Sequence, residues 1–462
     1  MFEAFPLLMF VLAIGILLLG YPVAFSLAGS ALAFGGFAFS IGLFDISFFS
    51  ALPARIYGIM GNQTLIAVPL FIFMGVMLER SKISEELLTT LGLLFGQIKG
   101  GIGVSIFLVG ALLAASTGIV GATVVTMGLI SLPVMLRYNY KPSFSAGIIC
   151  ASGTLGQIIP PSIILVLLGD VISSAYQQAQ LNLGNFAPGS VSVGDLFLGA
   201  LFPGFVLVGC YIIYILVASY FNPNLAPAIP AAEVEKAYSD GMFLRVLQVL
   251  IPPLLLIMGV LGSILAGMAT PTEAASVGCI GAIILTKIKG QLKKEILKSV
   301  LDKVVQINAM VFIILIGSSM FSLVFRGLGG DEVIARYLQN LPGGVVAAFL
   351  LVMLVIFILG FFLDFFEITF VVVPIVGPIL LMMGLDPIWL GIMIAMNLQT
   401  SFLTPPFGFA LFYLRGVAPD HISTKEIYQG VIPFIAIQIL VMGLLALFPE
   451  IVTWLPHYIY GS

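Results

Sequence analysis

The sequence has very little charge. Asp, Glu, Lys and Arg make up 8% of its 462 residues, whereas a soluble globular domain carries about 25%. Every polar segment between the apolar runs is short, which excludes a separate soluble domain. The apolar runs recur along the chain at about the 20 residues that a helix needs to cross a bilayer. The sequence therefore predicts an all-α polytopic membrane protein, with residues 1–462 forming a single integral membrane domain.

Residues that carry enzyme or metal chemistry are equally scarce. The chain has three cysteines, none in a CxxC spacing, and two histidines, His421 and His457, which lie far apart in the sequence. A disulfide framework and a zinc site are therefore not expected. The sequence also lacks a P-loop, an HExxH motif, a nucleophile elbow and a basic patch for nucleic acid. We expect neither an enzyme nor a cofactor.

Two proline pairs interrupt long apolar runs. They are Pro160–Pro161 in "GQIIPPSIIL" and Pro405–Pro406 in "SFLTPPFGFAL", which lie 405 − 160 = 245 residues apart. The same offset relates further prolines, namely Pro133 with Pro378 and Pro142 with Pro387. Four prolines in one ungapped register predict an internal repeat, with copies at about 62–172 and 307–417.

The distribution of Lys and Arg predicts that the two copies are inverted. Short loops inside the cell are enriched in these residues, so the basic cluster at 287–303 is expected to be cytoplasmic. The loop at 137–141, "RYNYK", is basic, whereas its counterpart at 384–386, "GLD", has no Lys or Arg. For the loops that follow the proline pairs the difference is reversed. The loop of the first copy, 172–195, has no Lys or Arg, whereas that of the second copy, 415–425, has both. Inverted repeats are typical of secondary transporters that work by alternating access.

The remaining segments are expected to surround the two copies. The sequence predicts N-terminal helices within 5–50, central helices within 196–286 and a C-terminal helix at 430–453. The polar segments 80–100 and 326–342 are expected to form amphipathic interfacial helices.

Helices that break at mid-membrane depth expose carbonyl groups at one half-helix end and N–H groups at the other. Irregular backbone at that depth is tolerated only where it is buried in protein or lines a cavity. The pairs Pro160–Pro161 and Pro405–Pro406 are therefore predicted to mark two binding sites for an ion and a solute. The alternative is that they kink their helices for packing alone.

Each copy also contains an apolar hairpin whose tip is expected to face the same cavity. In the first copy the tip offers small and hydroxyl residues at Ser116, Thr117 and Gly118, although such residues also serve helix packing. In the second copy Asp364 and Glu367 lie within an apolar run, where a charged group is costly and by default functional. The alternative for these carboxyls is a solvated turn. Oxygen ligands favour a hard cation, so we expect sodium, with proton transfer by Asp364 or Glu367 as the alternative.

Several segments together resemble a known family. They are "NQTLIAVPLFIFMGVMLER", "GTLGQIIPPSI", "ATPTEAASVG", "GFFLDFFEITFVVVPIVGPILLMMGLDPIWLGI" and "LTPPFGFALFYLRGVAP". Over nearly its whole length the chain resembles the large membrane subunit of TRAP (tripartite ATP-independent periplasmic) transporters of the DctM type. The resemblance implies a sodium-coupled importer of organic acids in the bacterial inner membrane. It also implies two partners, a small membrane subunit on a separate chain and a periplasmic solute-binding protein.

The resemblance further implies where sodium binds. The first site falls near Ser116, Gly156 and Pro160, and the second on Ser401, Thr404 and Phe407. No Lys or Arg lies near either proline pair apart from Arg415, so the substrate anion is expected to be held by helix N-termini and bound sodium. The outside loop at 176–194 looks longer than in sialic-acid or C4-dicarboxylate members of the family.

Two other functions stay open at this point. A stand-alone ion-coupled anion transporter with the same inverted repeats would work without partner subunits. A passive channel would conduct without responding to a sodium gradient.

Overall fold

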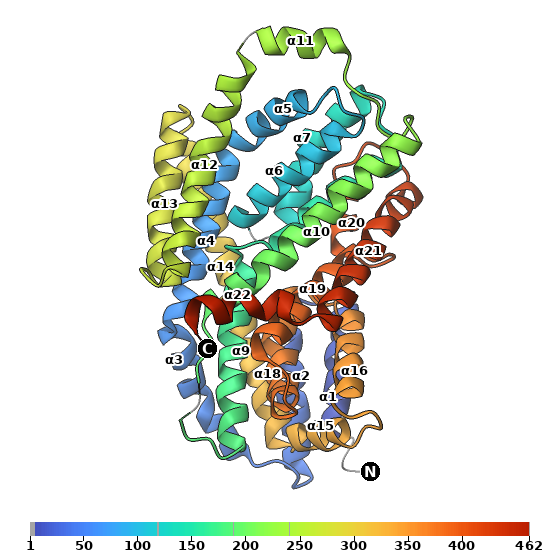
Figure 1. Cartoon of the computed structure of the whole chain (residues 1–462). Helices are drawn as coiled ribbons and strands as arrows, with labels where there is room; N and C mark the ends of the chain where they lie inside the picture. The colour runs from blue at the N-terminus through green and yellow to red at the C-terminus, as the bar shows by residue number, and fades with distance from the viewer. Residues whose placement is uncertain (1–4, 118–119, 188, 240, 462) are drawn as a thin grey trace. The chain divides into compact units, whose positions relative to one another are not determined.

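The computed structural model describes residues 5–117, 120–187, 189–239 and 241–461. The secondary structure of these residues is helical (Figure 1), and nine of their helices are long and apolar enough to cross a membrane. The predicted class, an all-α polytopic membrane protein with broken helices, is confirmed. The chain divides into two compact units, which we describe one at a time.

The first unit is built from three segments that are far apart in the sequence: Met1–Ile66, Leu167–Ser192 and Val305–Ile394. Its helices are α1 (Phe5–Leu18), α2 (Val23–Ser40), η2 (Ile46–Ala51), α3 (Leu52–Gly61), most of α9 (Ile163–Asn182) and α14 (Lys294–Gly327), α15 (Gly330–Gln339), α16 (Gly344–Leu359), α17 (Phe365–Glu367), η4 (Ile368–Val372) and α18 (Val373–Met382). The Phe10 ring of α1 meets the rings of Phe321 and Phe325 of α14 edge-on. The N-terminal helix is thereby fixed on the longest helix of the unit.

The second unit comprises Ala67–Val166, Val193–Val304 and Ala395–Ser462. Its helices are most of α4 (Gln63–Arg80), α5 (Ile83–Leu94), α6 (Gly101–Thr117), α7 (Val120–Arg137), α8 (Pro142–Thr154), η3 (Leu155–Gln157), α10 (Val193–Phe221), α11 (Ala231–Ser239), α12 (Met242–Leu265), α13 (Pro271–Ile288), the C-terminal half of α19 (Pro387–Leu403), α20 (Phe409–Arg415), α21 (Thr424–Leu447) and α22 (Glu450–Tyr460). Helices α8 and α21 cross very closely, since a Cβ atom on Gly147 would lie 2.0 Å from the carbonyl oxygen of Gly430. Small residues allow such close packing of membrane helices.

Both proline pairs interrupt their helices, as predicted. Helix α8 ends at Thr154, a short 3₁₀ turn follows, and α9 begins only at Ile163. Helix α19 ends at Leu403 and α20 begins at Phe409. The Pro160–Pro161 and Pro405–Pro406 peptide bonds are both cis.

The repeat register found in the sequence also holds for the helix boundaries. Helix α7 spans Val120–Arg137, and the run from α17 to α18 spans Phe365–Met382. Both boundaries are offset by 245 residues (365 − 120 and 382 − 137). Two equivalent segments of equal length therefore follow the two hairpin tips.

Contacts within the second unit give the relative direction of helices that flank the two breaks. Gly121 of α7 lies against the Tyr413 ring of α20, and Gly128 lies against Leu414 and against Val417, four residues beyond Tyr413, so α7 and α20 run in the same direction. A short turn at 138–141 joins α7 to α8, and the two helices pack side by side, so α8 runs the opposite way. The helix before the first break and the helix after the second therefore run in opposite directions, as predicted for inverted copies.

Two sequence predictions about segment boundaries were wrong. The loop predicted at 172–195 is helical as far as Asn182, because its Ala, Gln and Leu residues are good helix formers. The C-terminal helix predicted at 430–453 is two helices, α21 and α22, and Pro449 lies between them.

Candidate functional site

The first break is buried and capped by a residue of its own loop. Gly156, Pro160 and Pro161 are all buried. The hydroxyl of Ser162 donates to the carbonyl of Gly156, with 2.8 Å between the two oxygens. A buried carbonyl at the end of a helix needs such a partner because no water reaches it. Ser162 therefore stabilises the first break from within.

The second break is open to the surroundings of the chain. Thr404 and Pro405 are half-buried and Pro406 is exposed, while Phe407 is 44% exposed. Phe407 is the repeat counterpart of Ser162 (407 − 162 = 245), so this loop has no hydroxyl at the capping position. Instead, Tyr428 of α21 donates to the carbonyl of Pro406 at 3.0 Å.

Two hydroxyl groups lie at the end of α19 beside the second break. The hydroxyl of Ser401 donates to the carbonyl of Leu398 at 2.8 Å, and that of Thr404 donates to Thr400 at 2.7 Å. These bonds use only the hydrogen atoms, so both oxygens keep lone pairs for a cation. Residues three positions apart share one face of a helix, which allows Ser401 and Thr404 to act on one ion.

The two copies touch through a pair of equivalent residues. The side-chain Nε2 of Gln399 lies 3.4 Å from the hydroxyl oxygen of Thr154, and 399 − 154 = 245, the repeat offset. Gln157, in the first break, is completely buried. Neither polar atom of its side chain has a hydrogen-bond partner among the described residues. Such buried amides are candidate ligands for a water molecule or a small cation.

The first hairpin tip lies largely outside the described residues. Ser116 and Thr117 are the last residues of α6, but their side chains fall outside the described part, as does all of Gly118. The predicted roles of these three residues therefore stay predictions.

The two carboxyls of the second tip differ from each other. Asp364 caps α17, because its Oδ1 accepts from the backbone N–H of Phe365 at 2.7 Å. Glu367 is only 2% exposed, and its Oε2 has no hydrogen-bond partner among the described residues. The π-helical turn Ile368–Val372 follows it directly, and such turns are frequent at functional sites. Glu367 is thus the stronger functional candidate of the two.

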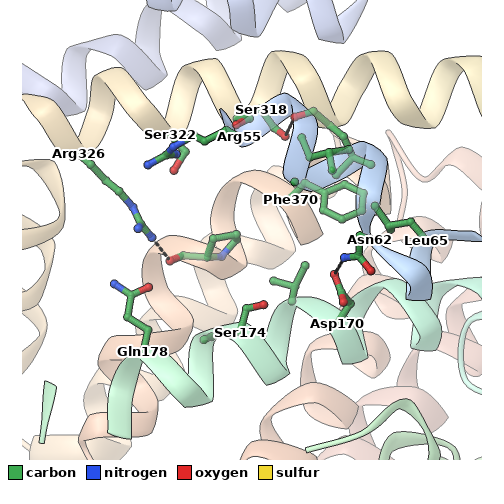
Figure 2. A pocket seen from close by; sticks show the side chains of 17 residues that line it. Arg55, Asn62, Leu65, Asp170, Ser174, Gln178, Ser318, Ser322, Arg326 and Phe370 are labelled. Atoms are coloured by element: carbon green, nitrogen blue, oxygen red, sulfur yellow. Dashed lines mark hydrogen bonds between the residues drawn. The ribbon is translucent and has the colours of Figure 1, made fainter. Parts of the chain in front are cut away.

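A cavity of the first unit was not anticipated from the sequence. It has a volume of about 410 Å³ and lies entirely within the first unit, where residues of α3, α9, α14 and α18 line it (Figure 2). Cavities of about 300–1,000 Å³ are typical of small-molecule sites. The lining is rich in polar side chains, including Ser318 and Ser322 of α14.

Two guanidinium groups face this cavity. Figure 2 shows Arg326 of α14 and Arg55 of α3 reaching into the same side of it. Arg326 donates to the carbonyl of Pro374 at 3.2 Å, and its Nε lies 3.1 Å from Asp331. No hydrogen-bond or ion-pair partner of Arg55 is found among the described residues. Burial and the neighbouring charge of Arg326 lower the pKa of Arg55, although an arginine stays protonated in proteins.

Asp170 of α9 lies on another side of the cavity. Its Oδ2 accepts from the side-chain amide of Asn62 at 3.0 Å. The other end of that amide, Oδ1, accepts from the backbone N–H of Thr64 at 2.9 Å. Because Asn62 is held at both ends, it fixes the orientation of the carboxylate. The cavity thus combines a paired cationic side with one positioned carboxylate (Figure 2).

Comparison with known proteins agrees with this architecture. The family model of the tripartite ATP-independent periplasmic transporter DctM component matches residues 10–451. The chain belongs to the DctM family. It is 28% identical over 477 residues to the C4-dicarboxylate TRAP transporter large permease DctM of Vibrio cholerae, with 98% of each chain covered. It is 28% identical over 451 residues to the sialic acid TRAP transporter large permease SiaM of the same organism, with 97% of each covered.

The fold of this DctM-family chain is also similar to that of a solved transporter. The crystal structure of the YdaH transporter of Alcanivorax borkumensis matches 88% of this chain and 90% of its own, with a TM-score of 0.60 at 13% identity. At that identity the likeness concerns the fold alone. The chain is therefore a multi-pass membrane protein of a transporter family.

The paired arginines of this DctM-family chain were missed for a physical reason. Arg55, Asp170 and Arg326 come from three distant segments, and only the tertiary fold brings them to one cavity. The expectation that helix N-termini and bound sodium hold the anion rests only on residues close to the proline pairs, and it stays a prediction. One signal was available, since Arg326 directly follows an apolar run at its polar end.

Proposed function

We propose that this chain is the large membrane subunit of a sodium-coupled tripartite transporter that imports an organic acid. The observation that carries the proposal is the pair Arg55 and Arg326 in a cavity of about 410 Å³. Guanidinium groups bind carboxylates through paired hydrogen bonds, and Arg55 has donors to offer. The broken inverted repeats supply the framework for alternating access.

Sodium is the proposed coupling ion, which is transported together with the substrate. The candidate ligands at the second break are the hydroxyl oxygens of Ser401 and Thr404 with the backbone at Pro405, Pro406 and Phe407. At the first break they are the backbone near Gly156 and Pro160. Oxygen-only ligand sets suit a hard cation. A proton carried by Glu367 is the alternative coupling ion.

The partners and location follow from the family. Members of the tripartite family suggest that a small membrane subunit and a periplasmic solute-binding protein work with this chain in the bacterial inner membrane. The binding protein would deliver the organic acid to the cavity. The alternative is a stand-alone anion transporter. The fold is similar to that of the YdaH transporter, which does not carry the name of the tripartite family. Uptake by this chain without partners would favour this alternative.

Uptake into proteoliposomes tests the proposal. The chain is reconstituted with its small subunit, and uptake of a labelled organic acid is followed with its binding protein added outside. An inward sodium gradient is expected to drive accumulation, whereas an equal potassium gradient is not. Flux that is the same with and without the sodium gradient would indicate a passive channel and contradict the proposal.

A further inference from the structure

The cavity that carries the proposed function has two chemically different sides. Figure 2 shows the arginine side chains together at one side, and Asp170 with Asn62 at another. Ser318 and Ser322 of α14 lie along the lining. A ligand that fills the cavity therefore meets cations at one part of its surface and a carboxylate at another.

The arginine side can bind an anionic group. Arg326 is held by the carbonyl of Pro374 at 3.2 Å and is partly neutralised by Asp331 at 3.1 Å. Arg55 has neither a hydrogen-bond partner nor an ion pair among the described residues, so its planar fork is available. A carboxylate is the group that best fits such a fork.

The Asp170 side demands a different group. One oxygen of this carboxylate accepts from Asn62 at 3.0 Å, and no donor to the other oxygen is found among the described residues. An ionised carboxylate only accepts hydrogen bonds, and a like charge brought next to it is unfavourable. A ligand group at this position must therefore be a donor, such as an ammonium or a hydroxyl.

We propose that the substrate is a bipolar organic acid, which carries a carboxylate at one end and a hydrogen-bond donor at the other. The carboxylate binds Arg55 and Arg326, and the ammonium or hydroxyl group donates to Asp170. This inference rests on the proposed function and narrows its substrate class. A simple dicarboxylate has an ionised carboxylate at each end. It would place one of these carboxylates against Asp170 and would therefore bind more weakly than a bipolar acid.

The inference is tested by thermal stabilisation of the purified membrane complex with four probes that share a five-carbon chain. They are pentanoate, 5-hydroxypentanoate, 5-aminopentanoate and glutarate. We expect the hydroxy and amino probes to reach half-maximal stabilisation at concentrations at least threefold lower than pentanoate, and glutarate to be the weakest. The order of the hydroxy and amino probes tells which donor the site prefers. Glutarate equal to or better than the amino probe overturns the inference, and so does the absence of any shift with both donor probes.

Variants at Asp170 and Arg55 test whether these residues cause the order of the four probes. Asp170→Asn is expected to abolish the advantage of the donor probes and leave pentanoate unchanged, whereas Asp170→Glu, which keeps the carboxylate, retains part of it. Arg55→Gln is expected to weaken all four probes at least tenfold. An unchanged probe order in Asp170→Asn contradicts the inference. Its failure is separable from that of the proposed function, because sodium-driven uptake in proteoliposomes does not depend on the probe order.

Discussion

The two helix breaks occupy the same position in their repeats but differ in what holds them. The first is buried, and Ser162 from the broken loop itself donates to the Gly156 carbonyl. The second is exposed at Pro406 and Phe407. Within its loop the N–H of Gly408 donates to the Thr404 carbonyl at 2.9 Å, and a side-chain hydrogen bond to the Pro406 carbonyl comes from Tyr428 of a neighbouring helix. The side-chain support of the first break thus comes from its own loop, whereas that of the second comes from a neighbouring helix. We therefore infer that the second break is the more adjustable of the two.

The largest expected effect comes from filling the second break. A Cβ atom on Gly408 would lie 2.6 Å from the Phe402 carbonyl oxygen and 2.9 Å from the Thr404 nitrogen. No side-chain rotation relieves a clash with backbone, so Gly408→Ala should destabilise this region by about 3 kcal/mol and reduce sodium-driven uptake at least tenfold. The matched control is Gly416→Ala, whose nearest contact would be an ordinary 3.5 Å. Normal uptake by Gly408→Ala would show that the break is more adjustable than we infer.

Removing the cap of the first break should have the next largest effect. Ser162→Ala leaves the buried Gly156 carbonyl without its side-chain partner, which costs about 1–3 kcal/mol. We expect a lower melting temperature of the purified protein. Ser105→Ala serves as the control, because this buried serine donates to a carbonyl of its own helix and its loss should matter less. Equal melting temperatures for Ser162→Ala and the unmodified protein would contradict the proposed capping role.

The adjustable break is where sodium dependence should be most sensitive. Thr404→Ala removes one hydroxyl oxygen beside the second break and is expected to raise the sodium concentration for half-maximal uptake several-fold. Thr404→Ser keeps the oxygen and should restore most of the response. Uptake measured against sodium concentration in proteoliposomes decides the matter. A normal sodium response in Thr404→Ala would remove Thr404 from the site.

The smallest expected effect is at the external support of the second break. Tyr428→Phe deletes the hydroxyl that donates to Pro406, a partly exposed bond worth about 0.5–1.5 kcal/mol. The melting temperature should fall less than in Ser162→Ala, while the rate of uptake changes measurably. A larger loss of stability than in Ser162→Ala would reverse the comparison between the two breaks.

The sequence revealed the breaks and their repeat because proline acts locally. Proline removes a backbone donor wherever the chain places it, so the interruptions at Pro160–Pro161 and Pro405–Pro406 could be predicted without tertiary information. The difference in burial between the two breaks could not, since it depends on which helices pack over them. The cavity was hidden for the same reason, because Arg55, Asp170 and Arg326 are brought together only by folding. The helix from residue 172 to Asn182 was missed because its many polar residues occur in loops as well as in helices.

The contact between Thr154 and Gln399 has a consequence for how such a protein can evolve. A pair of equivalent positions that touch must lie close to the pseudo-two-fold axis. In a dimer of two identical half-length chains, the residue at this position would contact the same residue of the other chain. A single substitution would then change both sides of the contact at once. Joining the halves in one gene lets the two positions mutate separately, so a threonine on one side can face a glutamine on the other.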